Sequence, residues 1–243
     1  MSTVTIVTLL VTALSTAIAG PPYTTDNPQP VPTGEWQIFV VGSANTGHGS
    51  YSAQVPYVEA DYGQSANTQI HLSLPLLYNS PRSAHSYFGP GDFDFALKYR
   101  FVQEDAKTPM VGIYPHINLP TGNYTEGLGA GHIQLFLPVW IQKTVGKWKF
   151  NSGGGYFLNP GEKNRDYWMF GGLVQRDLNH HLTMGGEVFY NSATKVGAKE
   201  QVDFRLALDF HRDPNHHLFV ALGRSIIGDN DLLAQAGVMW YTK

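Results

Sequence analysis

Charged and hydrogen-bonding side chains occupy every second position along several extended stretches of this 243-residue chain. In the stretch 92–101 every odd-numbered residue is apolar, whereas four of the five even-numbered residues are charged. The stretches 69–74 and 201–210 repeat the alternation. Such side chains can line a polar constriction that selects solutes, or they can neutralise one another where they fill a protein interior. The sequence leaves both interpretations open.

Pairing of neighbouring stretches would gather several of these side chains into one patch. A hairpin that turns at 63–67 places Glu59 level with His71. The same hairpin places Asp61 level with Gln69, and the next strand returns alongside with its two basic residues. We therefore expect one patch of Glu59, Asp61, His71, Lys98 and Arg100. The further residues that we expect to line the same interior are Asp94, His116, Asn118, Asp203 and Arg205.

The sequence carries no familiar catalytic or cofactor-binding motif. A His-Glu-x-x-His pair, a Gly-x-Ser-x-Gly elbow, a phosphate loop and a dinucleotide fingerprint are all missing. Two pairs among the ten histidines are adjacent, His180–His181 and His216–His217. Neighbouring residues on a strand face opposite ways, so neither pair predicts a chelating site. No serine stands convincingly beside His116 or His132 as a nucleophile. We predict no catalytic residue, no metal and no cofactor.

Extended runs with a period of two dominate the chain after residue 35, and no helical period interrupts them. Most runs are close to the ~9–11 residues that a tilted strand needs to cross a bilayer. The twelve predicted strands lie at approximately 35–45, 54–62, 68–76, 92–101, 110–119, 132–143, 147–157, 166–176, 182–190, 201–211, 217–225 and 232–241.

The overall composition fits this pattern. Charged residues make up 14% of the chain, below the roughly 25% of ordinary soluble domains. A net charge of −3 with scattered basic residues excludes a nucleic-acid footprint. The absence of cysteine excludes a disulfide scaffold and a thiolate metal site.

One apolar and one charged face on each strand require two different surroundings, and lipid outside with a polar lumen inside provides them. A soluble β-sandwich shares the alternation, but its second face is rarely so charged and its strands are shorter. We predict an all-β fold, a transmembrane antiparallel up-and-down β-barrel of about twelve strands over residues 35–243. Pro115 and Pro138 lie within predicted strands, where we expect a bulge or broken pairing.

Short and long connections alternate along the chain, as in outer-membrane barrels with short periplasmic turns and longer external loops. This alternation places both termini and the charged patch on the periplasmic side. The external loop 77–91 offers binding candidates in Tyr78, His85, Tyr87 and Phe88.

Two segments precede the predicted barrel. Residues 1–19 are expected to be a signal peptide, because an apolar run from Val4 to Leu14 is followed by small residues at Ala17 and Ala19. Residues 20–34 are predicted to be a proline-rich periplasmic arm, extended because proline fixes φ and removes donors. The arm is too short for a full plug domain but long enough to cap the periplasmic mouth.

Glycines cluster on three consecutive predicted strands, at 153–155, 171–172 and 185–186. Strand glycines mark curvature or room for large inward side chains. A sharper hypothesis is a deformable wall through which a hydrophobic solute leaves sideways into the membrane.

Three stretches resemble the family known as "putative MetA-pathway of phenol degradation": Gly20–Pro28 followed by Gly34–Trp36, Gly89–Asp92 leading into Ala96–Arg100, and Leu119–Asn123. The resemblance covers essentially the whole chain after residue 19. It implies an outer-membrane barrel that passes small, often hydrophobic or aromatic, compounds.

Three functions are compatible with these observations. The first is an outer-membrane channel for passive diffusion of a small-molecule solute. The second is a barrel enzyme of the lipid-hydrolase type, and the third is a structural or adhesive barrel that binds through its external loops. The expected partners are outer-membrane lipid, the solute and the barrel-assembly machinery, with no nucleic acid.

Overall fold

The structure is a computed structural model that describes residues 20–47, 50–81, 85–228 and 232–243. The expected signal peptide, residues 1–19, lies outside the described residues. In the described part of the chain no helix has the length and apolar character needed to span a lipid bilayer.

Nearly all of the regular structure is β-strand. The strands are β1 Trp36–Gly47, β2 Ser50–Ser65, β3 Thr68–Ser80, β4 Tyr87–Pro90, β5 Phe93–Val102, β6 Met110–Ile113, β7 His116–Leu119, β8 Gln134–Val145, β9 Trp148–Leu158, β10 Tyr167–Asn179, β11 Leu182–Asn191, β12 Gln201–Asp213, β13 His216–Ile227 and β14 Leu232–Thr242. Within the described residues, one 3-10 turn, η1 Tyr124–Glu126, lies in the connection between β7 and β8.

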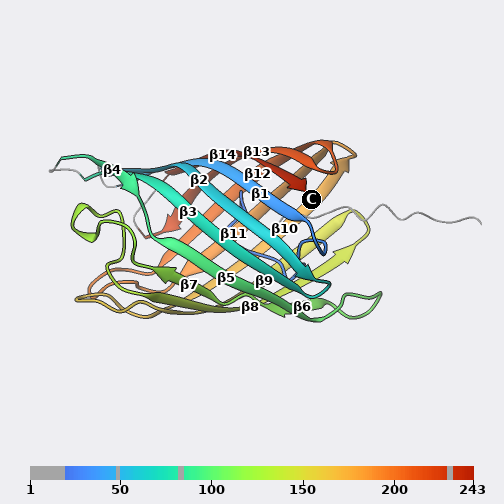
Figure 1. The fold of residues 1–243 in the computed structure, drawn as a ribbon, viewed down its shortest axis with the longest axis horizontal. Coiled ribbons are helices and arrows are strands. Elements are labelled where there is room, and N and C mark those ends of the chain that lie inside the picture. Colours follow the sequence, from blue (N-terminus) through green and yellow to red (C-terminus); the bar gives the residue numbers. More distant parts are fainter. Residues whose placement is uncertain (1–19, 48–49, 82–84, 229–231) are drawn as a thin grey trace, which may run out of the picture.

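These strands form one antiparallel sheet that closes on itself, because β1 pairs with β14 (Figure 1). β4 and β5 pair in succession with β3, and β6 and β7 pair in succession with β5 and β8. β4 and β5 together occupy one place in the barrel wall, and so do β6 and β7. The fourteen strands therefore form a closed barrel of twelve staves. The predicted fold class and strand number are confirmed.

Pro115 and Pro138, the two prolines predicted to lie within strands, affect different strand pairings. The carbonyl of Pro115 accepts a hydrogen bond from the Leu97 amide, so its missing N–H falls in the ladder with β5 and separates β6 from β7. The carbonyl of Pro138 accepts from the Tyr114 amide at the same interruption. β8 itself continues through Pro138, which pairs with Gly155 of β9. Broken pairing is therefore confirmed at Pro115, whereas β8 is not interrupted.

The alternation sorts side chains as predicted. On β5, Leu97 and Phe101 are 41% and 52% exposed on the outside, whereas Lys98 and Arg100 are 4% and 8% exposed inside. Successive side chains of a strand point to opposite sides, so the apolar and the charged residues of β5 lie on different faces. The barrel wall has an apolar exterior, and its interior combines polar side chains with buried apolar clusters such as Phe39, Val41, Phe219 and Met239.

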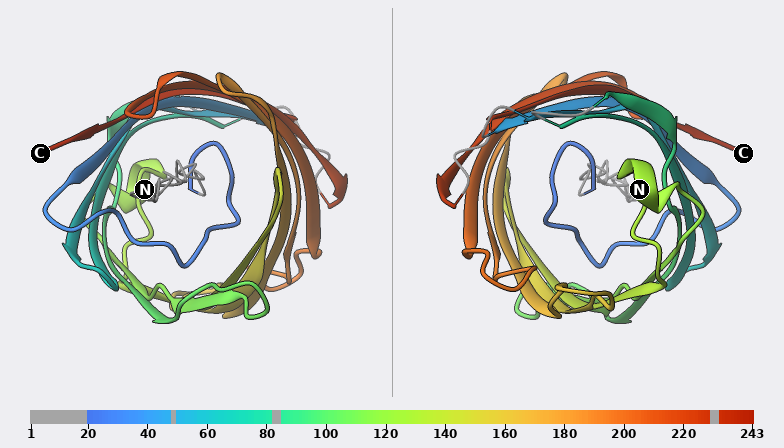
Figure 2. Two further views of the ribbon diagram at one scale, coloured as in Figure 1. Left: turned by 90° about the vertical axis from the view of Figure 1, so that its right-hand side faces the viewer. Right: turned by 90° about the vertical axis from the view of Figure 1, so that its left-hand side faces the viewer.

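Residues 20–35, the N-terminal arm, run inside the barrel and do not cap its mouth (Figure 2, blue segment). Thr25, Asn27 and Val31 of the arm are all buried. A proline-rich segment cannot pair as a strand, and its remaining amides need acceptors. The Val31 amide finds one in the side chain of Gln69, 2.9 Å away.

The two ends of the barrel differ. One end, here the turn end, carries tight connections such as 66–67, 146–147 and 214–215. The other, the loop end, carries the longer connections, of which 120–133 folds over the interior. Asp92 fixes this loop by accepting hydrogen bonds from the amides of Gly122 and Ala130, at 2.9 and 2.6 Å.

Candidate functional site in the barrel interior

The interior of the barrel contains a buried row of carboxylates and histidines. Asp61 of β2 lies directly opposite His71 of β3, and the two side chains are joined at 2.8 Å between Oδ1 and Nδ1. Glu59, two residues earlier, lies 3.8 Å from the same ring nitrogen. Tyr57 donates a 2.8 Å hydrogen bond to Glu59 from its hydroxyl.

The predicted register of this hairpin was wrong by two residues. Glu59 is level with Ser73 rather than with His71, and Gln69 is opposite Gly63. The chain turns more tightly than expected, pairing Ser65 with Thr68, and the register shifts between Gly63 and Ser65. Because a bulge adds a residue to one strand only, the alternation of side chains does not reveal it.

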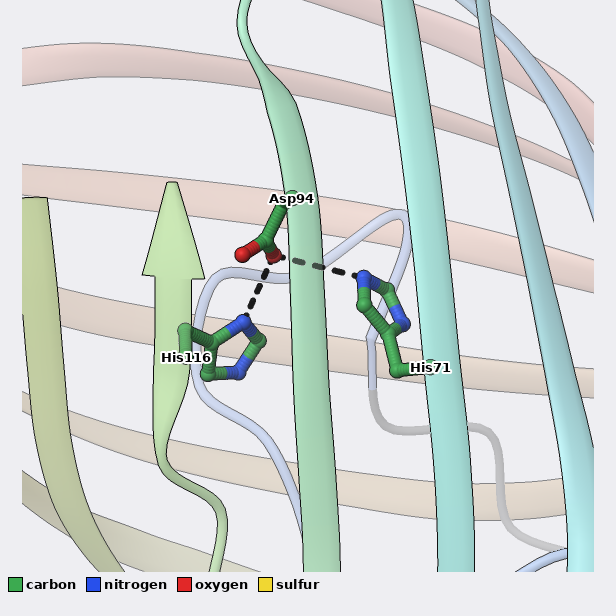
Figure 3. Close-up of side chains that lie close together, drawn as sticks. All are labelled: His71, Asp94 and His116. Atoms are coloured by element: carbon green, nitrogen blue, oxygen red, sulfur yellow. Dashed lines mark hydrogen bonds and ion pairs between the residues drawn. The ribbon is translucent and has the colours of Figure 1, made fainter. Parts of the chain in front are cut away.

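The row continues through Asp94 of β5 and His116 of β7 (Figure 3). Asp94 lies between two histidines: its Oδ2 is 2.7 Å from Nδ1 of His116 and 3.4 Å from Nε2 of His71. Asp94 and His116 were both predicted to line the interior, but their contact with His71 was not predicted. The ring of Tyr114 packs against His116 with 4.3 Å between centroids.

Lys98 and Arg100 do not complete the expected patch. Lys98 pairs instead with Asp26 of the arm, with 3.0 Å between Nζ and Oδ1, and lies over the ring of Tyr114. Arg100 donates to Gln29 of the arm at 2.8 Å. It also donates to the 66–67 turn, through Ala66 O and Asn67 Oδ1. The arm supplies partners that no pairing of strands predicts.

A second group of contacts holds the beginning of the arm against the opposite wall. Glu187 of β11 accepts hydrogen bonds from the amides of Thr24 and Thr25. Arg205 of β12 donates to the carbonyl of Pro22 at 2.6 Å and lies 3.7 Å from Glu187. Arg205 was an expected lining residue. The alternation along its strand indicated that Glu187 faces inward, but its hydrogen bonds to the arm were not predicted.

Two glycines make room for the arm on that wall. A Cβ at Gly171 would overlap the hydroxyl of Thr25, and a Cβ at Gly185 would overlap the hydroxyl of Tyr23. Glycine is the residue that lets another segment approach a strand this closely. The expectation of room for inward groups holds at these two positions, where the groups come from the arm.

The remaining lining candidates lie farther from the arm. Asn118 pairs with Asp94 across β7 and β5, and Asp203 accepts a hydrogen bond from the Gln201 side chain at 3.0 Å. A cavity of about 540 Å³ lies beside Asp94 and Asn118 towards the loop end. Its other lining groups include Tyr57, Ser73 and the inward-folded loop 127–130. Asp94 is therefore the member of the row of carboxylates and histidines that borders this interior cavity.

The predicted external loop 77–91 is largely part of the wall. Tyr78 belongs to β3 and pairs with Phe88 of β4, and Tyr87 pairs with Asn79. These strands continue farther than predicted, and their aromatic residues Tyr78, Tyr87 and Phe88 favour a pleated surface. His85 lies outside the strands and is exposed. The four candidates thus do not form one loop, and loop 120–133 covers the interior instead.

The fold is that of outer-membrane β-barrels. The COG4313 outer membrane channel from Pseudomonas putida F1 superposes with a TM-score of 0.71 and 14% identity, covering 93% of this chain and 100% of the other. The NanC porin gives 0.60 at 10% identity, covering 84% and 98%. The KdgM porin in complex with disordered oligogalacturonate gives 0.58 at 11% identity, again covering 84% and 98%.

A comparison with curated protein sequences found no match. Residues 25–241, most of the chain, match a family described as "Putative MetA-pathway of phenol degradation". The match begins within the arm and ends in β14, so it includes every strand and most of the segment inside the barrel. The chain belongs to this family.

Proposed function

We propose that this protein is an outer-membrane channel that passes small solutes, hydrophobic and aromatic ones included, by passive diffusion. The observation that carries the proposal is a closed wall with an apolar exterior, whose interior contains buried polar side chains and a cavity of about 540 Å³. The fold shared with outer-membrane channels and porins supports the location. The family description supports aromatic compounds as the solute class.

We place both termini on the periplasmic side. The arm and the end of β14 meet at the turn end, where Trp36 pairs with Thr242. Barrels of this class keep short turns in the periplasm and longer loops outside. In this orientation the cavity beside Asp94 faces the outside, and a solute reaches the histidine row before it reaches the arm.

The arm sets the narrowest part of the proposed path. It is bound on one wall by Glu187 and Arg205 and on the other by Lys98 and Arg100. A solute passing through must move between these contacts or displace them. The lumen is thus a wide entrance followed by a segment that the arm narrows.

Conductance in planar bilayers and swelling of liposomes test the channel. The folded barrel, identified by heat-modifiable gel mobility, should give discrete conductance steps and let small solutes into vesicles. Phenylalanine and serine are a useful pair of solutes, because faster swelling with phenylalanine would support an aromatic preference. A folded barrel with no conductance and no swelling contradicts the channel and favours the enzyme or adhesive alternatives.

A further inference from the structure

We propose that His71, Asp94 and His116 form a binding site for a divalent transition cation of the Zn²⁺ class. The three side chains come from β3, β5 and β7, which are neighbours in the barrel, and they point toward one another (Figure 3). Each offers one ligand atom, and all of these atoms lie within 4.8 Å of one another. Two imidazoles and a carboxylate are a donor set that such cations favour.

The spacing of the ligand atoms fits a small cation. Metal–ligand bonds of 2.0–2.2 Å in a tetrahedron put neighbouring ligands about 3.4 Å apart. Asp94 Oδ2 lies 3.4 Å from His71 Nε2, and it accepts a 2.7 Å hydrogen bond from Nδ1 of His116, whose proton a bound cation would replace. A small rotation of His116, whose side chain is 19% exposed, brings the third ligand into place.

The hydrogen bonding of His71 prepares it as a ligand. Its Nδ1 donates to Asp61 at 2.8 Å, so in the neutral ring the lone pair is on Nε2 and faces the Asp94 carboxylate. Two hydrogen-bond acceptors, His71 Nε2 and the Asp94 carboxylate, then face each other with no proton between them. A carboxylate on the far nitrogen of a ligating histidine is the usual supporting contact in metal sites, where it fixes the tautomer and raises ligand basicity.

Two buried polar atoms at the site have no hydrogen-bond partner among the described residues, Nε2 of His71 and Oδ1 of Asp94. The side chain of His71 is only 3% exposed. A buried polar atom without a partner costs free energy, and a cation between these two groups would remove that cost.

The charges around the site also favour a cation. Glu59, Asp61 and Asp94 bring three carboxylates to the two histidines. Lys98 of the same strand as Asp94 is already paired with Asp26 of the arm. An excess of negative charge in a buried region is unfavourable unless a positive charge compensates it.

A cation can reach this site, and its position has a structural consequence. The cavity beside Asp94 opens a path from the loop end. The site ties three neighbouring strand positions together next to Pro115, where β6 and β7 are separated. Pro115 cannot donate a ladder hydrogen bond to β5, and a bound cation would hold the neighbouring strands together at this point instead.

A second cluster in the described part of the chain, Asp209, His211 and His217, provides the comparison. His217 contacts Asp209 through Nδ1 and the carbonyl of Pro214 through Nε2, so both ring nitrogens already have partners. His211 contacts Asp209 at 2.8 Å. We therefore place the cation at His71, Asp94 and His116, and use His217 as the matched control.

The test is metal binding by the folded full-length barrel in detergent after treatment with a chelator. Zn²⁺ is titrated calorimetrically, and Co²⁺ is added in parallel because its visible absorption reports ligand number and geometry. We expect one equivalent per chain and a spectrum of four- or five-coordinate Co²⁺. His116→Gln and Asp94→Asn should each abolish this equivalent, whereas His217→Gln should retain it. Gel mobility checks the fold of every variant.

Asp61→Asn tests the supporting contact separately, because Asp61 positions His71 without touching the cation. It should weaken binding about 10–100-fold while leaving the Co²⁺ spectrum unchanged in shape. Three results would overturn the proposal: no binding by the parent protein, binding that survives in both His116→Gln and Asp94→Asn, or binding lost only in His217→Gln. The first would mean that His71 is an imidazolium shared between Asp61 and Asp94.

Discussion

The amide of Thr25 donates a 2.5 Å hydrogen bond to the carboxylate of Glu187, 162 residues away in the sequence. The amide of Thr24 donates to the same carboxylate at 2.9 Å. The Glu187 side chain is 1% exposed, so this carboxylate exchanges its hydration for two amides and the neighbouring Arg205. This contact fixes the arm to the wall of the barrel.

Replacing Glu187 by alanine should therefore loosen the arm. The change leaves the amides of Thr24 and Thr25 without their acceptor and removes the ion-pair partner of Arg205, which costs about 1–3 kcal/mol. We expect a lower free energy of unfolding in urea and larger, noisier conductance steps. Glu162→Gln, an exposed loop position, is the control and should change neither measurement. Unaltered conductance in a folded Glu187→Ala barrel would show that this contact does not hold the arm.

Gly171 and Gly172 offer a test that leaves the arm sequence intact. A side chain at Gly171 would overlap Thr25, whereas a Cβ at Gly172 has no heavy atom within 4 Å. Gly171→Val should displace the arm and increase conductance, with an overpacking cost of about 1–3 kcal/mol. Gly172→Val should leave conductance as it is. Equal conductance changes in the two variants would mean that valine alters strand β10 itself, and that displacement of the arm is not the cause.

Leu206 tests which surface meets lipid. This residue is 51% exposed on the outer face of β12. Leu206→Arg should lower the free energy of unfolding in lipid vesicles by ~2–4 kcal/mol if the residue lies near the bilayer midplane. Leu218→Arg, close to the 214–215 turn, should cost less because the penalty falls toward the interface. Equal costs at both positions would argue against this placement of the bilayer.

Lys98 tests whether the interior charges select ions. It is 4% exposed, and its ammonium group pairs with Asp26 over the ring of Tyr114. Lys98→Gln removes a positive charge from the proposed path and leaves Asp26 uncompensated. We expect a shift toward cation selectivity, measured as the reversal potential in a KCl gradient. Lys199→Gln, on an exposed loop where solvent screens charge, should shift it little.

The residues that carried the sequence-based prediction were the alternating ones. Phe95, Leu97 and Tyr99 are all exposed on the outside, and Lys98 and Arg100 are buried inside, as their spacing predicted. The period of two is a local property of extended chain, so it can be seen in one strand without knowledge of its neighbours. The strand number follows from counting such runs.

The partners of those residues were harder to predict. The tight turn at 66–67, together with the register shift between Gly63 and Ser65, places Asp61 opposite His71, where Glu59 was expected. A bulge depends on how two strands fit together, and the sequence of one strand does not record it. His71, Asp94 and His116 were each predicted to face inward, but their contact required the register of β3, β5 and β7 together.

By itself, the sequence determined a twelve-stranded barrel, the direction in which its side chains point and the chemical difference between its two faces. Only the tertiary structure decided where the arm lies, because an extended segment with five prolines has no periodicity to indicate its partners. Its binding groups, Glu187, Arg205, Gln69, Lys98 and Arg100, are distributed along more than 130 residues of sequence and meet only when the barrel closes. The difference has one physical cause, since the faces of a strand follow from local backbone geometry whereas long-range contacts depend on how the whole sheet is paired.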